Sequence, residues 1–165
     1  MNALERLIEH HCQTTSQCIE LCSNLPEADL DRPSADPRPY YWHEGPVSLR
    51  AMLGKASAFA APWMEAINGV KTDYAPSTFA DMRESLARNR LAFLEILRTV
   101  ERDQSWDLTF VDAVCEPPEV FSFGGVIAHV VSFNAYRRIA LLRELSAHGI
   151  EAFEAADPML YRPEA

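Results

Sequence analysis

Apolar residues recur at steps of three and four along most of the chain, a spacing that predicts amphipathic helices. The first such stretch covers residues 3–25 and stops at Pro26. The second begins after Ser48, a residue that caps helix N-termini well, and runs to Gly69. Pro62 falls inside this second stretch, so we expect the helix to kink or split there.

Two further helices follow, separated by a change of pattern. A Thr-x-x-Asp capping box starts the third predicted helix, which covers residues 79–102. Residues 106–111 are rich in aromatic and β-branched side chains, and with residues 120–121 they predict a short hairpin or other extended excursion. The final predicted helix covers residues 123–147.

Together these elements predict an all-α protein, a four-helix bundle with a long first crossover and a short extended segment before the last helix. The crossover, residues 26–46, carries five prolines and an aromatic cluster. A connection of this length in a compact domain is usually functional or packed over another surface. No segment resembles another at a fixed period, which excludes a repeat solenoid. At 165 residues, the chain is expected to form a single domain over residues 1–165.

Charge and composition narrow the classes of function. The formal net charge of −9 argues against a nucleic-acid partner, because phosphate binding needs clustered Lys and Arg. The sequence has no apolar run as long as a membrane span and no basic-then-apolar leader, so we expect a cytoplasmic protein without a membrane partner. In that compartment the four cysteines are expected to be reduced.

The final helix carries the most informative side chains. Four of them share one helical face: His129, Phe133, Tyr136 and Arg137. Apolar residues flank this stripe, so we expect it to face the bundle interior, and we expect Arg138, one step round the helix, to point outward or to a helix edge. An inward Arg137 needs a carboxylate or an anion, since an unpaired buried charge is costly. The simpler alternative is that it extends to a carboxylate at the rim of the bundle.

The final helix also carries a resemblance to a known family. Residues 123–138, Phe-Gly-Gly-Val-Ile-Ala-His-Val-Val-Ser-Phe-Asn-Ala-Tyr-Arg-Arg, resemble the final-helix signature of the DinB/YfiT-like family. Residues 47–55 and Trp63 are similar to that family's second helix, and residues 108–113 to the extended segment before its last helix. The resemblance implies a four-helix bundle that, in many members, holds a divalent metal with three histidines. Some members are thiol-dependent transferases, and most have no assigned reaction.

The positions of the family's metal ligands are not histidines in this chain. The ligand position on the second helix falls at Lys55, and the i, i+4 pair on the final helix falls at Phe133 and Arg137. Tyr136 occupies a further position that is often histidine. Charged Lys and Arg have no lone pair for a metal, and Phe has none at all. We therefore expect no cofactor; a Zn or Ni ion belongs only to the alternative that the chain is an enzyme.

The replaced ligands suggest a different kind of site. Lys55 and Arg137 would put two positive charges where relatives hold a dication. With His129 and Tyr136 as hydrogen-bond donors and Phe133 beside them, these residues would form a pocket for a small anionic ligand. The structural alternative is that both cations pair with buried carboxylates and fix the register of the bundle.

Two further groups of residues are candidates for a role in a site. His43 precedes the second helix, at the expected mouth of the pocket, where it could act as a base or donor. His11, Cys18 and Cys22 share the inward stripe of the first helix, but His11 and Cys18 are roughly 10 Å apart along the axis, too far for one zinc ion without another ligand. Buried free thiols are the expected outcome there.

Two functions remain open on the sequence alone. The first is a protein without metal, expected to be a homodimer, whose former metal pocket binds a small anion or is filled, or which acts through a partner. The second is an enzyme, such as a thiol-dependent transferase, that uses Tyr136, His129 and His43 with or without a metal. The replaced ligands favour the first function.

Overall fold

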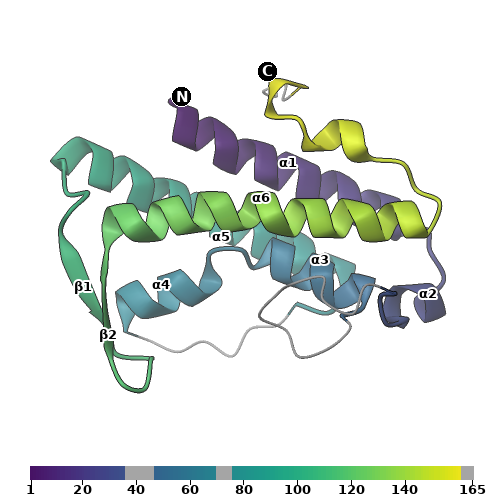
Figure 1. Cartoon of the computed structure of the whole chain (residues 1–165), viewed down its shortest axis with the longest axis horizontal. Coiled ribbons are helices and arrows are strands. Elements are labelled where there is room, and N and C mark those ends of the chain that lie inside the picture. The colour runs from purple at the N-terminus through teal and green to yellow at the C-terminus, as the bar shows by residue number, and fades with distance from the viewer. Residues whose placement is uncertain (36–46, 70–75, 161–165) are drawn as a thin grey trace.

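The structure is a computed structural model of the 165-residue chain and describes residues 1–35, 47–69 and 76–160. This part of the chain is mostly helical with one small two-stranded sheet, which confirms the predicted all-α class at this level (Figure 1). In chain order the elements are α1 (Ala3–Cys22), α2 (Glu27–Asp31), α3 (Leu49–Ser57), α4 (Ala61–Asn68), α5 (Phe79–Asp103), β1 (Thr109–Asp112), β2 (Glu119–Ser122), α6 (Phe123–Ala147) and the short 3-10 turns η1 (Phe153–Ala156) and η2 (Pro158–Leu160).

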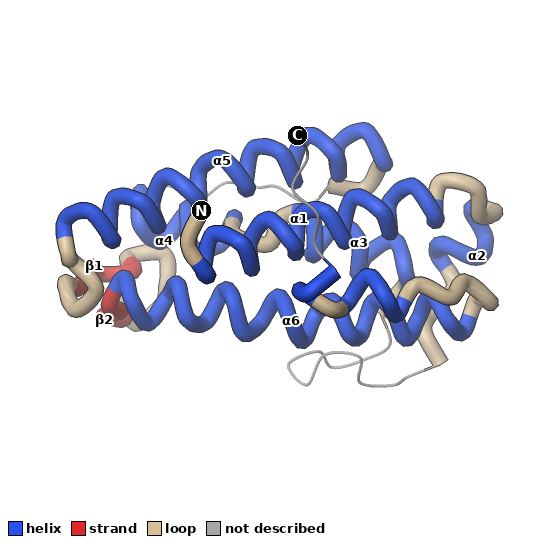
Figure 2. The backbone as a smooth tube through the Cα atoms, turned by 90° about the horizontal axis from the view of Figure 1, so that it is seen from above, coloured by secondary structure: helices blue, strands red, loops and turns tan. Residues whose placement is uncertain are grey.

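The long helices lie side by side around one core (Figures 1 and 2). Helix α1 packs against α5, α6 and α3, and α3 in turn packs against both α5 and α6. The segment after α6 folds back, so that η1 contacts α6 and η2 contacts α1. One continuous set of buried apolar side chains joins all of these helices. Any site on α6 is therefore bordered by α1 on one side and by α3 on the other.

The predicted second helix is split, as its proline indicated. Helix α3 ends at Ser57, and α4 begins at Ala61 with Pro62 in its first turn, where no backbone N–H is needed. Gly69 ends α4 in the left-handed conformation, with φ of 65°. The short helix α2, inside the predicted crossover, has no periodic apolar pattern long enough to predict it.

The predicted extended excursion is an antiparallel hairpin. Strand β1 pairs with β2 from Thr109↔Ser122 to Asp112↔Glu119, and the chain then enters α6 directly. The Gly124 N–H donates to the Trp106 carbonyl oxygen at 2.8 Å. A Cβ on Gly124 would lie 2.9 Å from that same oxygen, so only glycine permits this close approach. The hairpin thus fixes where α6 begins.

The face of α6 that enters the core differs from the predicted one. His129 and Tyr136 are exposed, and Phe133 is only half-buried. Arg138, expected to point outward, is 9% exposed and buried. Its predicted direction was wrong, and so was the inward stripe. The buried side chains follow one another at steps of mostly three and four: Val126, Ile127, Val130, Asn134, Arg138, Leu141, Leu142, Glu144 and Leu145.

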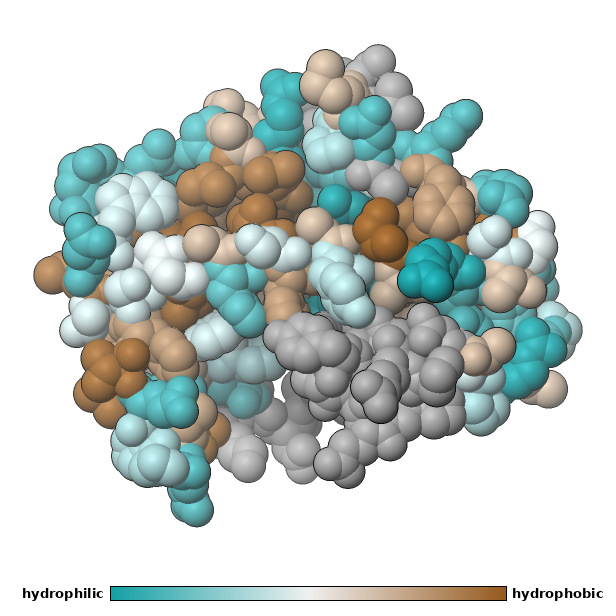
Figure 3. All heavy atoms as spheres, in the orientation of Figure 1, coloured by the Kyte–Doolittle hydropathy of each residue, from teal (hydrophilic) through white to brown (hydrophobic). Residues whose placement is uncertain are grey.

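Apolar side chains also reach the surface. In Figure 3, hydrophobic side chains lie in separate groups, over the helices as well as at the hairpin end. In the hairpin, Val111 and Val120 are 58% and 63% exposed. Within residues 1–35, 47–69 and 76–160, no helix is long and apolar enough to span a membrane.

Candidate functional site

Three of the predicted site residues form a stacked column along α6. His129, Phe133 and Arg137 follow one another at steps of four, which places them one above the other on a helix. The imidazole of His129 stacks on the Phe133 ring with centroids 4.5 Å apart and an interplanar angle of 26°. The guanidinium carbon of Arg137 lies 5.3 Å from the centre of the same ring. Trp63 of α4 packs edge-on against His129 at 5.2 Å and closes this end of the column.

The column is tied to the neighbouring helix pair through Arg137. Its Nη1 donates to the carbonyl oxygen of Phe59, in the turn between α3 and α4, at 3.4 Å. Burial lowers the pKa of the Lys55 ammonium on α3, and the nearby Arg137 lowers it further. Burial and Arg137 likewise lower the pKa of His129. Lys55 and His129 come from different helices, and both lie within the electrostatic reach of the Arg137 guanidinium.

The other predicted pocket residues contribute less to this cluster. Tyr136 lies on α6 next to the column, but it is 43% exposed. His43 lies outside the described residues. Across the described ranges, no three His, Cys, Asp or Glu side chains are grouped so that they could hold a metal ion.

A second polar cluster lies on the α1 side of α6, and the sequence analysis missed it. His11, Asn134 and Arg138 are 1%, 2% and 9% exposed. His11 Nε2 lies 3.1 Å from the Ala56 carbonyl oxygen, so Nε2 carries the proton and donates it. Burial lowers the pKa of His11 to about 3, and Arg138 and Arg137 also lower it. The imidazole is therefore neutral at physiological pH, with its lone pair on Nδ1.

The polar atoms of this cluster are not satisfied within the described structure. Both amide atoms of Asn134, Nδ1 of His11 and Nε of Arg138 are buried without a hydrogen-bond partner. Each such group costs about 1–3 kcal/mol relative to its hydrated state. A signal for two of them existed in the sequence, since Asn134 and Arg138 continue at steps of four the apolar series that begins at Val126 and Val130.

The buried thiols of α1 lie near this cluster but are unreactive. Cys18 and Cys22 are both 0% exposed. Burial raises the pKa of each thiol to about 12, so both remain protonated at neutral pH. A protonated thiol is a poor nucleophile and a poor metal ligand. The cysteines are therefore core side chains, as the sequence predicted.

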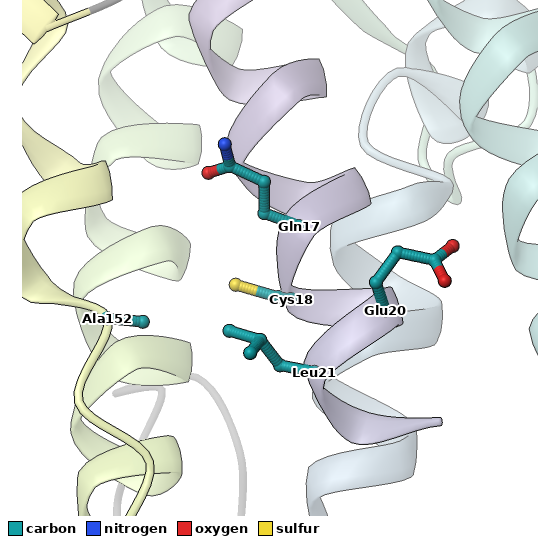
Figure 4. A pocket seen from close by; sticks show the side chains of 5 residues that line it. All are labelled: Gln17, Cys18, Glu20, Leu21 and Ala152. Atoms are coloured by element: carbon teal, nitrogen blue, oxygen red, sulfur yellow. The ribbon is translucent and has the colours of Figure 1, made fainter. Parts of the chain in front are cut away.

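A surface groove runs between α1 and the segment that follows α6 (Figure 4). It has a volume of about 410 Å³, and its lining residues are Gln17, Cys18, Glu20, Leu21 and Ala152. Cys18 and Leu21 point from α1 toward Ala152. Because Cys18 is fully buried, its thiol forms the closed floor of this groove.

Comparison of the sequence with models of known protein families gives no match, and comparison with curated proteins gives none either.

Proposed function

We propose that this protein binds a small anionic ligand on the α3 side of α6, through Lys55 and Arg137. The observation that carries the proposal is electrostatic. The guanidinium of Arg137 lies close enough to lower the pKa of both Lys55 and His129. Like charges gathered from two helices repel one another, and an anion placed among them reverses the sign of that energy.

Each side chain would have a distinct part in binding. The Phe59 carbonyl oxygen and the Phe133 ring orient Arg137, whose planar guanidinium suits carboxylate and phosphate groups. Lys55 adds a compact positive charge from α3. His129 is poised to gain a proton when an anion arrives, and Trp63 offers an apolar wall beside it.

We further propose that the fold is a DinB/YfiT-like four-helix bundle in which this cationic site takes the place of the family's metal site. The order of the helices, the long crossover and the hairpin before α6 support this proposal. The positions of Lys55, Phe133 and Arg137 support it as well, because these three side chains replace the family's ligands and share one electrostatic cluster. Stoichiometric Zn or Ni in the purified protein would contradict the metal-free site and favour the enzyme alternative.

Titration with inorganic phosphate, followed by NMR of the histidine side chains, tests the anion site. We expect the pKa of His129 to rise when phosphate binds, because a nearby negative charge favours the imidazolium form. Lys55→Met and Arg137→Met should each weaken binding about tenfold or more, as loss of a charge-assisted hydrogen bond predicts. Arg143→Met, an exposed change on the same helix, is the matched control and should leave the affinity unchanged. Equal affinity in the wild type, Lys55→Met and Arg137→Met would refute the proposal.

A further inference from the structure

We propose that the core of the bundle holds a second and separate site, formed by His11, Asn134 and Arg138, for a small oxyanion that keeps at least one O–H group. Bicarbonate, with one such group, and dihydrogen phosphate, with two, have this chemistry. The site shares no side chain with the proposed function, since Arg138 is about 100° round the helix from Arg137.

The three side chains come from two packed helices. Asn134 and Arg138 are one turn apart on α6, so their side chains occupy the same face. Helix α1 packs along this face. Arg138 acts electrostatically on both His11 and Cys18 of α1. His11 is held in place by the Ala56 carbonyl oxygen and by an edge contact with the Phe59 ring at 4.8 Å.

The unsatisfied atoms define what the ligand must offer. Nε of Arg138 and the amide nitrogen of Asn134 are donors, and they require acceptor oxygens. Nδ1 of His11 and the amide oxygen of Asn134 are acceptors, and they require a donor. The guanidinium favours negative charge. A monovalent oxyanion with at least one O–H group supplies acceptors, one or two donors and a negative charge in one small molecule.

Within the described structure, no carboxylate of the chain serves as the anionic partner of Arg138. The buried acidic side chains there are Glu5, Asp112 and Glu144. Glu5 accepts from Arg98, the Asp112 carboxylate accepts from the loop that follows β1, and Glu144 accepts from Ser34. No ion pair in the described ranges includes Arg138.

The groove between α1 and the segment after α6 offers an approach from solvent. Its floor is the buried Cys18 thiol, which lies within the electrostatic reach of Arg138.

The test uses the full-length chain with Arg137→Met as the background, so that the site at Lys55 and Arg137 is weakened. Its thermal midpoint is measured in bicarbonate, phosphate, formate and chloride at equal ionic strength. We expect bicarbonate or phosphate to raise the midpoint by roughly 5–10 °C at 100 times its dissociation constant, and formate and chloride, which have no O–H group, to raise it far less. Adding Asn134→Leu or Arg138→Met should abolish the response.

Nitrogen NMR of His11 gives a second readout that does not depend on the stability of the variants. The Nδ1 resonance should move when the oxyanion donates to its lone pair. Suppose that the oxyanion raises the thermal midpoint of the wild type but not that of Arg137→Met, and that the His11 resonance does not move. This result would overturn the interior site and leave the proposed function standing. If the rise in thermal midpoint is unchanged in Arg137→Met and is lost when Asn134→Leu is added, the interior site is supported and the proposed function is weakened. If the rise persists in the Arg137→Met, Asn134→Leu double variant, the interior site is overturned.

Discussion

Arg137 and Arg138 are neighbours in sequence, but α6 places them in different environments. Arg137 is half-buried, donates to the Phe59 carbonyl oxygen and lies over the Phe133 ring. Arg138 is 9% exposed, and its Nε is buried without a hydrogen-bond partner in the described part of the chain. One residue along the sequence is about 100° round the helix. Position on the helix, more than residue type, therefore decides how much free energy the buried guanidinium costs and what it can bind.

The largest expected effect comes from removing the buried charge. Arg138→Met should raise the free energy of unfolding by about 1–4 kcal/mol in buffer without oxyanions, because an apolar side chain of similar length replaces a desolvated cation. Urea denaturation measures this change. A loss of 3–5 kcal/mol, about what breaking a buried ion pair costs, would mean that Arg138 is paired in the folded protein.

The next effect concerns His11, which reports on the interior face. Its pKa falls from 6.5 to about 3 in the folded chain, so the unfolded chain binds more protons below pH 6.5. Stability is therefore lost as the pH falls, by about 2 kcal/mol between pH 7 and pH 5 from this residue alone. His129, whose pKa is also lowered, acts in the same direction, so the comparison is between the wild type and His11→Gln. Urea denaturation between pH 7 and pH 5 should show that the free energy of unfolding changes less with pH in His11→Gln than in the wild type. An equal change in both proteins would show that His11 takes up its proton in the folded state.

Arg137→Met should lower the free energy of unfolding, in contrast to the increase expected for Arg138→Met, and by a smaller amount. It removes a hydrogen bond to Phe59 and a cation–ring contact with Phe133, and we expect a loss of about 0.5–1.5 kcal/mol. The same urea experiment measures it. Stabilisation of similar size in Arg137→Met and Arg138→Met would erase the contrast between the two faces.

The smallest effect is a change in the titration of His129. Arg137 lowers the pKa of this imidazole, and Arg138 has no part in that shift. Histidine NMR should therefore show a higher pKa for His129 in Arg137→Met and an unchanged one in Arg138→Met. Equal shifts in the two variants would show that both guanidinium groups lie near the column.

Much of the fold followed from the spacing of apolar residues, but the orientation of α6 did not. The starts of the long helices, the break at Pro62 and the hairpin were confirmed because each depends on local backbone chemistry. The buried face of α6 depends on what α1 presents to it. Asn134 and Arg138 continue the four-residue series of Val126 and Val130, but hydrophobicity gives no reason to place polar side chains in the core.

The candidate site was predicted in part. The proximity of Lys55 to Arg137 was expected from the resemblance alone, because periodicity gives no distance between helices. The stacking of His129 on Phe133 follows from their spacing on one helix. The interior cluster required the packed structure, since His11 and Asn134 are far apart in the chain and carry no shared motif.

The most direct test of two anion sites on different faces of α6 is a crystal structure with arsenate, a phosphate analogue whose arsenic scatters anomalously. Two anomalous peaks are expected. One should lie beside Lys55 and Arg137, and the other within hydrogen-bond distance of Asn134 and Arg138. Crystals saturated with arsenate that show no peak at either position would rule out both anion sites.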